Sequence, residues 1–495
     1  MMKKLSLIIL AFISLTTISY AQNVDDALRY SQIFYGGTAR FMSMGGAFTA
    51  LGGDLSTLSQ NPAGIGVFRS SEISVTPQLF HINSTSSFNG INSDYLYDFN
   101  LNQIGIVGNI FNKNNESGLL TLNFGYSFNR TNNLNQRIII KGVSNKSSMA
   151  DYWVDQSNGL YPDELANNAA DAYLAYDTYI IDTLSVSGFD YGTVYSHYGD
   201  NPPSIYGQSM RRLITYEGGT AEHALSIGGN YSNKIYFGAT LGISRINYKS
   251  HYEHFESTDV NFASGFQNFD YTMHYENTGT GYSLKIGTII KPIESLRIGL
   301  AFHSPTLYKI NEYYYDNITS KFSDGNYESS NSPMRYSYAL TTPFRALAGV
   351  AWQIKKFGLI SADYEFVDYS AARFSQTGDN YDYTKKNNEI KNTLQSANNI
   401  RLGGEVRLNK LYLRGGYGYY GKAFKAGDIN ENQDYTSISF GTGFREQNVN
   451  VDFGFTSFRN SQDYLLYNSS VGSPMANLDV KRNIFTVTFG YKFGY

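Results

Sequence analysis

The 495-residue sequence contains no cysteine, only two tryptophans and ten prolines, and just 16% charged residues. The absence of cysteine excludes a disulfide scaffold and a lipoprotein anchored through a cysteine. Ordinary soluble domains carry roughly 25% charged residues, and a net charge of −3 predicts no nucleic-acid partner. No apolar run reaches the about 20 residues that a membrane helix needs, and a mean hydropathy of −0.33 is too low for a bundle of such helices.

Glycine, tyrosine and phenylalanine are abundant, with 47, 43 and 32 copies. Together with the scarcity of charge, this composition is typical of a β-barrel that has a polar lumen and an aromatic-rich outer face. It also argues against a disordered chain, which would have few aromatic residues.

Residues 1–21 have the pattern of a secretory signal peptide. Lys3 and Lys4 precede the apolar stretch 5–13, and Ser19-Tyr20-Ala21 forms a small-x-small cleavage site. We therefore predict removal of this segment after Ala21.

A two-residue alternation of apolar and polar side chains is the strongest signal in the sequence. In the stretch 484–495, every second residue from Phe485 to Tyr495 is apolar, and the residues between them are small or polar. The pattern recurs at 235–244, 296–303, 400–408 and 449–455. Strands with one face of bare hydrocarbon fit a lipid environment, and strands in lipid must close into a barrel.

Tight polar turns alternate with long segments along the chain, such as 129–215, 250–268 and 311–332, as expected of short periplasmic turns and long external loops. We therefore predict an all-β fold, a transmembrane antiparallel β-barrel of about 14 strands spanning residues 72–495, in an outer membrane of the Gram-negative type. The predicted partners are outer-membrane lipid around the wall and the barrel-assembly machinery at the terminal strand 484–495. The barrel is predicted to be a monomer.

The longest loop, residues 129–215, contains one stretch without alternation. Within 163–181, Leu165, Ala169, Ala172 and Tyr176 fall near helical spacing. We predict a short amphipathic helix there, which shields the mouth of the barrel, forms an entry groove for an apolar ligand, or has no role beyond the structure of the loop.

Residues 22–71 precede the first alternating strand and carry three Gly-Gly pairs around the apolar piece 41–51. A lumen of about fourteen strands is wider than side chains can fill. A glycine-rich segment can turn tightly and approach a wall closely. We therefore predict that it forms a hatch, or plug, inside the lumen.

Several stretches resemble the outer-membrane long-chain fatty-acid and hydrocarbon transporters of the FadL/TodX type. They are Arg40–Ala47 followed by Asn61-Pro62-Ala63-Gly64, Arg297–Pro305 with its Ser-Pro ending, Thr342–Trp352 and Leu413–Tyr419. The resemblance implies a fourteen-stranded barrel, a hatch bearing the Asn-Pro-Ala motif, and passive uptake of hydrophobic compounds. It further implies external capture, a pocket inside the barrel, and lateral release at a kink in the third strand, for which Gly125 is the candidate.

Two groups of residues are candidates for the ligand pocket. The apolar group on the hatch comprises Phe34, Phe41, Phe48, Leu51 and Leu58, and inward-facing Arg297, Arg401 and Arg414 are candidates for a carboxylate head group. The alternative for the apolar group is packing within the hatch. For the arginines it is ion pairing with Glu405, Asp363 or Glu365.

Two other function classes remain open at this stage. One is a surface receptor or shuttle that docks a secreted partner or binds haem, for which His251 and His254 in a long loop could ligate the iron. The other is a barrel enzyme such as a lipase, which would use His303 and Ser304. We predict no enzymatic activity, no cofactor and no metal site, since the phosphate-binding and zinc-binding motifs are absent.

Overall fold

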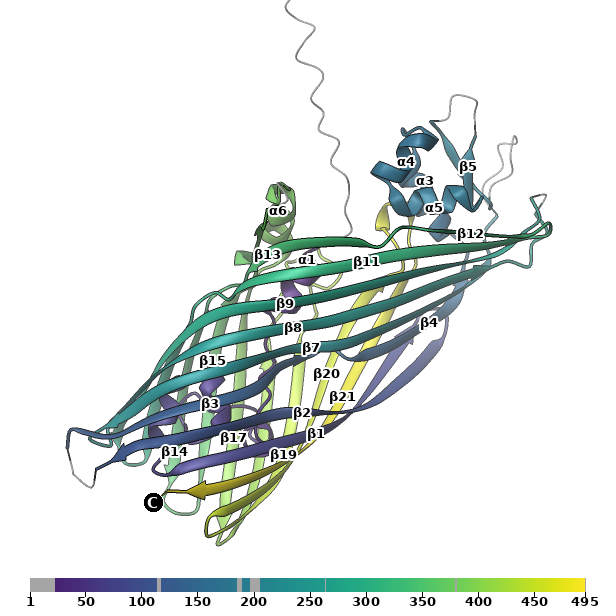
Figure 1. Ribbon diagram of the computed structural model, residues 1–495. Coiled ribbons are helices and arrows are strands. Elements are labelled where there is room, and N and C mark those ends of the chain that lie inside the picture. Colours follow the sequence, from purple (N-terminus) through teal and green to yellow (C-terminus); the bar gives the residue numbers. More distant parts are fainter. Residues whose placement is uncertain are drawn as a thin grey trace, which may run out of the picture.

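The computed structural model describes residues 23–113, 117–184, 189–195, 205–262, 264–378 and 381–494, so the predicted signal peptide and its cleavage site after Ala21 lie outside the described residues. A large antiparallel sheet wraps around the N-terminal segment, and helices lie over one end (Figure 1). Among the described residues, none of the helices combines the length and the apolar character needed to cross a membrane.

The barrel consists of fourteen antiparallel strands, as predicted. Several of them are interrupted, so that β3 and β4, β10 and β11, β12 to β14, and β15 and β16 each follow one path. Pairing of β1 with β21, from Ser71 opposite Phe493 upward, closes the cylinder.

The strands have the following bounds: β1 Ser71–Ser87, β2 Ile91–Asn112, β3 Leu119–Asn133, β4 Gln136–Ser144, β5 Ile181–Thr183, β6 Tyr191–Thr193, β7 Gln208–Tyr231, β8 Ile235–Ser257, β9 Phe266–Ile293, β10 Leu296–His303, β11 Leu307–Phe322, β12 Asn326–Ser330, β13 Met334–Thr341, β14 Arg345–Ile354, β15 Gly358–Asp368, β16 Arg373–Gln376, β17 Ser396–Leu408, β18 Leu411–Tyr420, β19 Tyr435–Glu446, β20 Val449–Leu465 and β21 Met475–Phe493. The helices are α1 Val24–Ser31, α2 Ala39–Ser43, α3 Met149–Ser157, α4 Pro162–Asn168, α5 Ala170–Asp177 and α6 Thr384–Thr393, with short 3-10 turns η1 Leu55–Ser59, η2 Pro62–Val67, η3 Tyr369–Ala371 and η4 Ser469–Val471.

The two faces of the sheet are those that the alternation predicts. In β21, Phe485 and Phe489 are 50% and 52% exposed, whereas Thr486 and Thr488 are 2% and 1% exposed. Apolar side chains thus point away from the protein and polar ones point inward, which is the reverse of a soluble sandwich. This arrangement is stable only when lipid covers the outer face.

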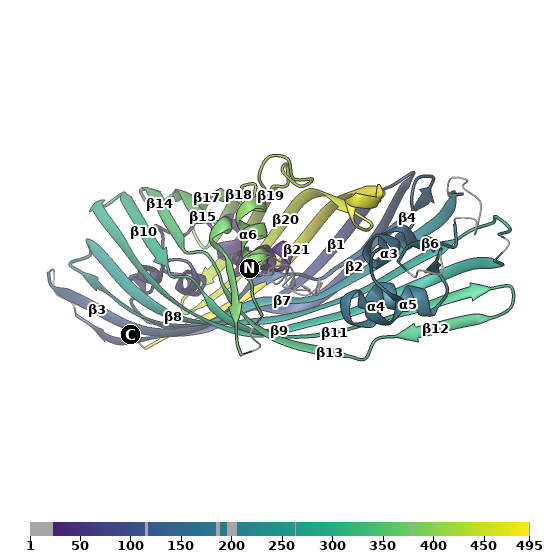
Figure 2. The same cartoon turned by 90° about the horizontal axis from the view of Figure 1, so that it is seen from above.

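The N-terminal segment lies inside the barrel, as the sequence predicts. Helix α1 packs among aromatic residues of β8, β11 and β13, near α6. The chain then continues through α2, η1 and η2 to the opposite end, where β1 begins at Ser71. Figure 2 shows the sheet curving around this purple segment.

The strands of one side are longer than the sequence suggested. β7, β8 and β9 have 24, 23 and 28 residues, and much of the predicted loops at 250–268 and 311–332 is strand. The helix predicted within 163–181 is present as α4 and α5, separated at Ala169. Helix α3 was not predicted, although Ser148 and Asp151 form a capping box at its start.

Candidate functional site

The hatch is seated on a belt of inward-facing glycines. A Cβ atom at any of them would press against residues of the hatch: Gly228, Gly238, Gly287, Gly299, Gly349, Gly403, Gly416, Gly441 and Gly454. They lie on β7, β8, β9, β10, β14, β17, β18, β19 and β20. Because these residues lack side chains, the hatch backbone lies directly against the barrel wall. The wall is therefore shaped to hold this segment.

The Asn-Pro-Ala motif lies at the centre of this seat. The Asn61 amide donates to the carbonyl oxygens of Thr49, at 2.6 Å, and of Thr288, at 3.3 Å. Its Oδ1 accepts the N–H of Ala63 at 3.1 Å and so caps η2, which Pro62 begins. Asn61 thus links two parts of the hatch to β9. The Gly64 N–H donates to the Asn61 carbonyl at 2.9 Å.

Charged side chains of the wall also hold the hatch. Asp363 accepts the Thr49 N–H at 2.9 Å and its hydroxyl at 2.7 Å. Lys285 pairs with Glu222 at 2.6 Å and donates to the Ser59 carbonyl at 2.8 Å. Burial strengthens such contacts because water does not compete for them.

The three candidate arginines make contacts of this kind. Arg401 pairs with Glu365 at 2.9 Å, and Arg414 pairs with Glu405 at 2.7 Å and with Asp452 at 2.6 Å. Arg297 donates to the carbonyl of Leu51 in the hatch at 2.6 Å. The ion-pair alternative therefore describes Arg401 and Arg414, and a ligand role for the three arginines stays a prediction.

The candidate apolar residues of the hatch separate into three environments. One cluster contains Phe41, Phe48 and Leu51, together with Tyr35, Met42 and Met44. Leu58 packs in another cluster, with Leu55, Ile65, Phe68, Val107 and Ala224. Only Phe34 lines the apolar cavity described next.

A narrow cavity lies between the hatch and strands β1–β3 and β19–β21. Its wall combines apolar and cationic groups: Phe34, Met42, Tyr435, Phe458 and Ile484, together with Gly36, Gln78, Asn102, Arg130, Asn132, Asn133 and Arg482. The Phe34 ring lies 4.9 Å from the rings of both Tyr420 and Tyr435. The free volume is about 50 Å³, against the roughly 150 Å³ of an engineered cavity that binds benzene. A ligand would therefore have to displace Phe34 or its neighbours.

Arg130 and Arg482 are the cations of this cavity. The Nε atoms of both lack a hydrogen-bond partner among the residues that the structure describes, and Arg482 donates to Gln136 at 3.3 Å through Nη2. Among the described residues, neither forms an ion pair with a carboxylate, unlike Arg401 and Arg414. Sequence reasoning missed both residues.

The cavity lies where the barrel wall is interrupted. The β2–β3 ladder ends at Gln103 opposite Asn129, and the upper part of β2 pairs only with β1. Strand β4 has β7 as its ladder partner, so β2 and β4 are joined through side chains. Asn135 donates to Asp98 at 2.7 Å, and Arg137 pairs with Asp94 at 3.3 Å. We call this junction the β2–β4 seam.

Gly125, the candidate for the kink, lies below this seam. It pairs with Val107 of β2 and with Ser226 of β7, so the ladder is continuous on both sides there. The register of β3 shifts instead between Leu119 and Thr121 and between Arg130 and Asn132. The second shift borders the cavity.

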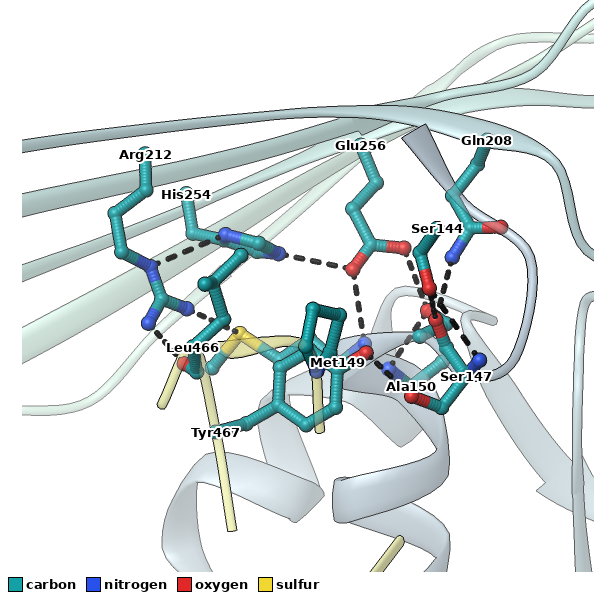
Figure 3. Close-up of polar contacts among 12 residues, drawn as sticks. Ser144, Ser147, Met149, Ala150, Gln208, Arg212, His254, Glu256, Leu466 and Tyr467 are labelled. Carbon is teal, nitrogen blue, oxygen red and sulfur yellow. Dashed lines mark hydrogen bonds and ion pairs between the residues drawn. The ribbon is translucent and has the colours of Figure 1, made fainter. Parts of the chain in front are cut away.

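A helical cap lies over the far end of the barrel and is anchored by a buried polar network (Figure 3). Glu256 of β8 accepts the Met149 N–H at 2.8 Å and the Ser148 hydroxyl at 2.6 Å, at the start of α3. His254 lies 2.9 Å from Glu256 through Nε2, while Arg212 donates to its Nδ1 at 3.3 Å. Because Nδ1 is an acceptor, Nε2 carries the proton that Glu256 accepts.

The cap helices share one apolar core. Trp153, Leu165, Leu174 and Ile180 are fully buried and pack with residues of β8 and β9. Asp171 of α5 is also buried, and this burial together with the nearby Asp316 raises its pKa to about 7. The cap is thus a folded part of the barrel mouth.

The residues named for the two alternative functions do not form sites. His251 is exposed and His254 is buried, so the two point to opposite faces of β8. His303 contacts the Gln60 carbonyl at 2.7 Å, whereas the Ser304 hydroxyl donates to Pro305. Among the described residues, no cluster of His, Asp and Glu could hold a metal ion.

A closed barrel with lipid-facing apolar residues, filled by its own N-terminal hatch, defines an outer-membrane transport protein of the hatch-plugged class. The chain belongs to the outer membrane protein transport protein family (OMPP1/FadL/TodX), whose profile matches residues 222–494. The resemblance seen in the sequence is confirmed. Members of this family are transporters and not enzymes.

Solved structures share the fold across almost the whole chain. The Pseudomonas putida toluene transporter TodX is 11% identical, with a TM-score of 0.53, and the match covers 93% of this chain and 99% of that one. A Pseudomonas aeruginosa FadL homologue is 11% identical, with a TM-score of 0.56, and the match covers 94% and 100%. A search of curated protein sequences finds no match.

Proposed function

We propose that this protein takes up hydrophobic compounds passively through the outer membrane, and that long-chain fatty acids suit it better than uncharged hydrocarbons. The observation that carries this proposal is the cavity with Phe34 on one side and Arg130 and Arg482 on the other. Aromatic and aliphatic groups bind a hydrocarbon chain, at roughly 0.8 kcal/mol for each buried CH₂. Two guanidinium groups without carboxylate partners suit an anionic head group.

The proposed path begins at the external cap and leads to this cavity. Rearrangement of the hatch segment around Phe34 enlarges the cavity, since its present volume of about 50 Å³ cannot hold a fatty acid. The ligand then leaves sideways through the β2–β4 seam, where no backbone ladder has to be broken. Each step needs only the binding energy of the ligand and its concentration gradient.

Ligand binding to purified protein tests the cavity. We expect Arg482→Gln to weaken binding of a fluorescent long-chain fatty acid about ten- to a hundredfold, the usual effect of losing a charge-assisted hydrogen bond, and to leave toluene binding unchanged. Phe34→Ala should weaken both. Arg335→Gln, which alters an exposed external arginine over Tyr313, is the control. Fatty-acid binding that is indifferent to Arg482→Gln would overturn the head-group assignment.

Crosslinking tests the seam. Because the sequence contains no cysteine, a thiol crosslinker reacts only with the two introduced cysteines. Cysteines at positions 98 and 135, joined by a short thiol crosslinker, would bridge the junction where Asn135 now contacts Asp98. Cysteines at 209 and 257 form the control, because Ser209 and Ser257 are already ladder partners in β7 and β8. Uptake should stop only in the first protein. Normal uptake with a fully crosslinked seam would refute lateral release.

A further inference from the structure

A second cavity, of about 340 Å³, lies at the opposite end of the barrel from the cap. Its lining includes residues at or near the short turns that follow β9, β14, β17 and β19, and it is covered on the inner side by Leu51, Gly52, Gly53 and Val67 of the hatch. The short turns place it on the periplasmic side. The hatch separates it from the cavity around Phe34.

The lining of this periplasmic cavity is strongly cationic. Six basic residues contribute to it, against a single carboxylate, Glu405: Arg40, Arg297, Lys355, Lys356, Arg407 and Arg445. That carboxylate is already shared by Arg40, at 3.0 Å, and Arg414, at 2.7 Å. The positive charge of the other side chains is therefore not balanced inside the cavity.

The hydrogen bonds of these basic residues confirm the imbalance. Within the described part of the chain, Arg297 and Arg407 donate only to backbone carbonyls, at 2.6 Å to Leu51 and at 3.2 Å to Asn409. The Nε of Arg445 has no partner. Among the described residues, none of these three arginines forms an ion pair with a carboxylate, whereas Arg401 and Arg414 do.

An aromatic platform holds two of the guanidinium groups in place. The Tyr412 ring lies under Arg445, at 4.6 Å, and under Arg407, at 5.7 Å. Stacking of this kind fixes the plane of a guanidinium group before a ligand arrives, so less conformational entropy is lost on binding. Beside it, Leu51, Val67, Ala351 and Leu359 provide an apolar patch.

We propose that this cavity is a periplasm-facing binding site for a small organic anion, with a carboxylate or phosphate held by Arg297, Arg407 and Arg445 and a short apolar part against the hatch. The site is distinct from the transport cavity and does not depend on which compound the barrel transports. Its occupant touches Leu51 and Val67, so binding there also adds contacts to the hatch.

Equilibrium binding to the full-length barrel in neutral-lipid nanodiscs tests the proposal, with octanoate and inorganic phosphate as separate probes. We expect saturable octanoate binding that Arg445→Gln and Arg297→Gln each weaken about tenfold or more, and that weakens as salt is added. Phosphate binding of equal strength would show that the charge alone is recognised, and weaker phosphate binding would show that the apolar patch contributes. Either result supports the site.

Two control variants separate this site from the proposed transport function. Arg335→Gln lies outside both cavities, and Arg482→Gln alters only the cavity around Phe34. Arg335→Gln should bind octanoate as the wild type does, and the octanoate binding that remains in Arg482→Gln should fall about tenfold or more when Arg445→Gln is added. Folding of every variant is checked by its heat-dependent mobility on a gel. Absence of saturable binding, or binding unchanged in folded Arg445→Gln and Arg297→Gln, would overturn the proposal, even if fatty-acid uptake were fully established.

Discussion

The glycine belt makes a sharp prediction at two adjacent positions of β18. A Cβ at Gly416 would overlap the Gly45 N and Met44 C atoms of the hatch backbone, whereas a Cβ at Gly415 would meet nothing nearer than 4.0 Å. The two residues lie on opposite faces of the same strand. Gly416→Ala therefore disturbs the seat of the hatch, and Gly415→Ala serves as its matched control.

The size of the effect follows from these contacts. Overpacking against a backbone that cannot rotate away costs about 1–3 kcal/mol. The shift also strains the hydrogen bond from the Gly45 N–H to the Ser439 hydroxyl, which measures 3.1 Å and is worth about 1 kcal/mol. A loss of about 2–4 kcal/mol raises the population with a displaced hatch about 30-fold or more, since each 1.4 kcal/mol is a factor of ten. Gly415→Ala should be neutral or slightly stabilising.

Ion conductance of single barrels in a planar bilayer measures that population directly. We expect Gly416→Ala to open at least an order of magnitude more often than the wild type, and Gly415→Ala to behave as the wild type does. Proteolysis of the hatch from the periplasmic side gives an independent readout. Equal opening of the two variants would refute the idea that close backbone contact with the wall holds the hatch.

Three further outcomes follow from other contacts. Asn61→Ala removes the donor to the Thr49 and Thr288 carbonyls; leaving buried acceptors unpaired costs about 1–3 kcal/mol, so protease cleavage of the hatch should accelerate while the barrel stays folded. Glu256→Gln weakens the acceptor at the start of α3, and hydrogen exchange in the cap should become faster there than in β21. Burial raises the pKa of Asp171 from 3.8 to about 7, so the folded cap binds this proton more tightly than the unfolded chain does, and the cap loses roughly 3 kcal/mol of stability as the pH rises from 4 to 7; rate-corrected hydrogen exchange of α5 should show this slope, and Asp171→Asn should abolish it.

The sequence predicts the barrel well because the relevant information is local. Each strand separates lipid from a polar lumen, so a rhythm of two residues, as at Phe485 to Phe489, is enough to assign both faces. The hatch was predictable for a related reason, because Asn61, Pro62 and the glycine pairs lie close together in the chain. The lengths of β8 and β9 could not be predicted, because both faces of a strand carry polar residues where it extends outside the membrane.

The cavity could not be predicted because its residues are far apart in the chain. Arg130 and Arg482 meet only when β21 pairs with β1 and closes the barrel. In the sequence, each resembles Arg401 or Arg414, which lie in similar alternating strands and have carboxylate neighbours. Pairing across the lumen decides which arginines have a carboxylate partner and which do not. The one weak signal in the sequence is Arg482, which lies in the terminal strand and has no acidic residue two positions away. This spacing indicates an arginine without a carboxylate neighbour on its own strand.

The length of β9 also determines where a ligand first meets this protein. A strand of 28 residues at about 3.3 Å per residue is about 90 Å long, and a tilt of about 45° leaves about 65 Å along the membrane normal. The hydrocarbon band needs only about 25 Å of that height. The mouth with its helices therefore stands tens of ångströms above the lipid. A ligand that binds at the mouth would therefore meet the protein well above the lipid surface.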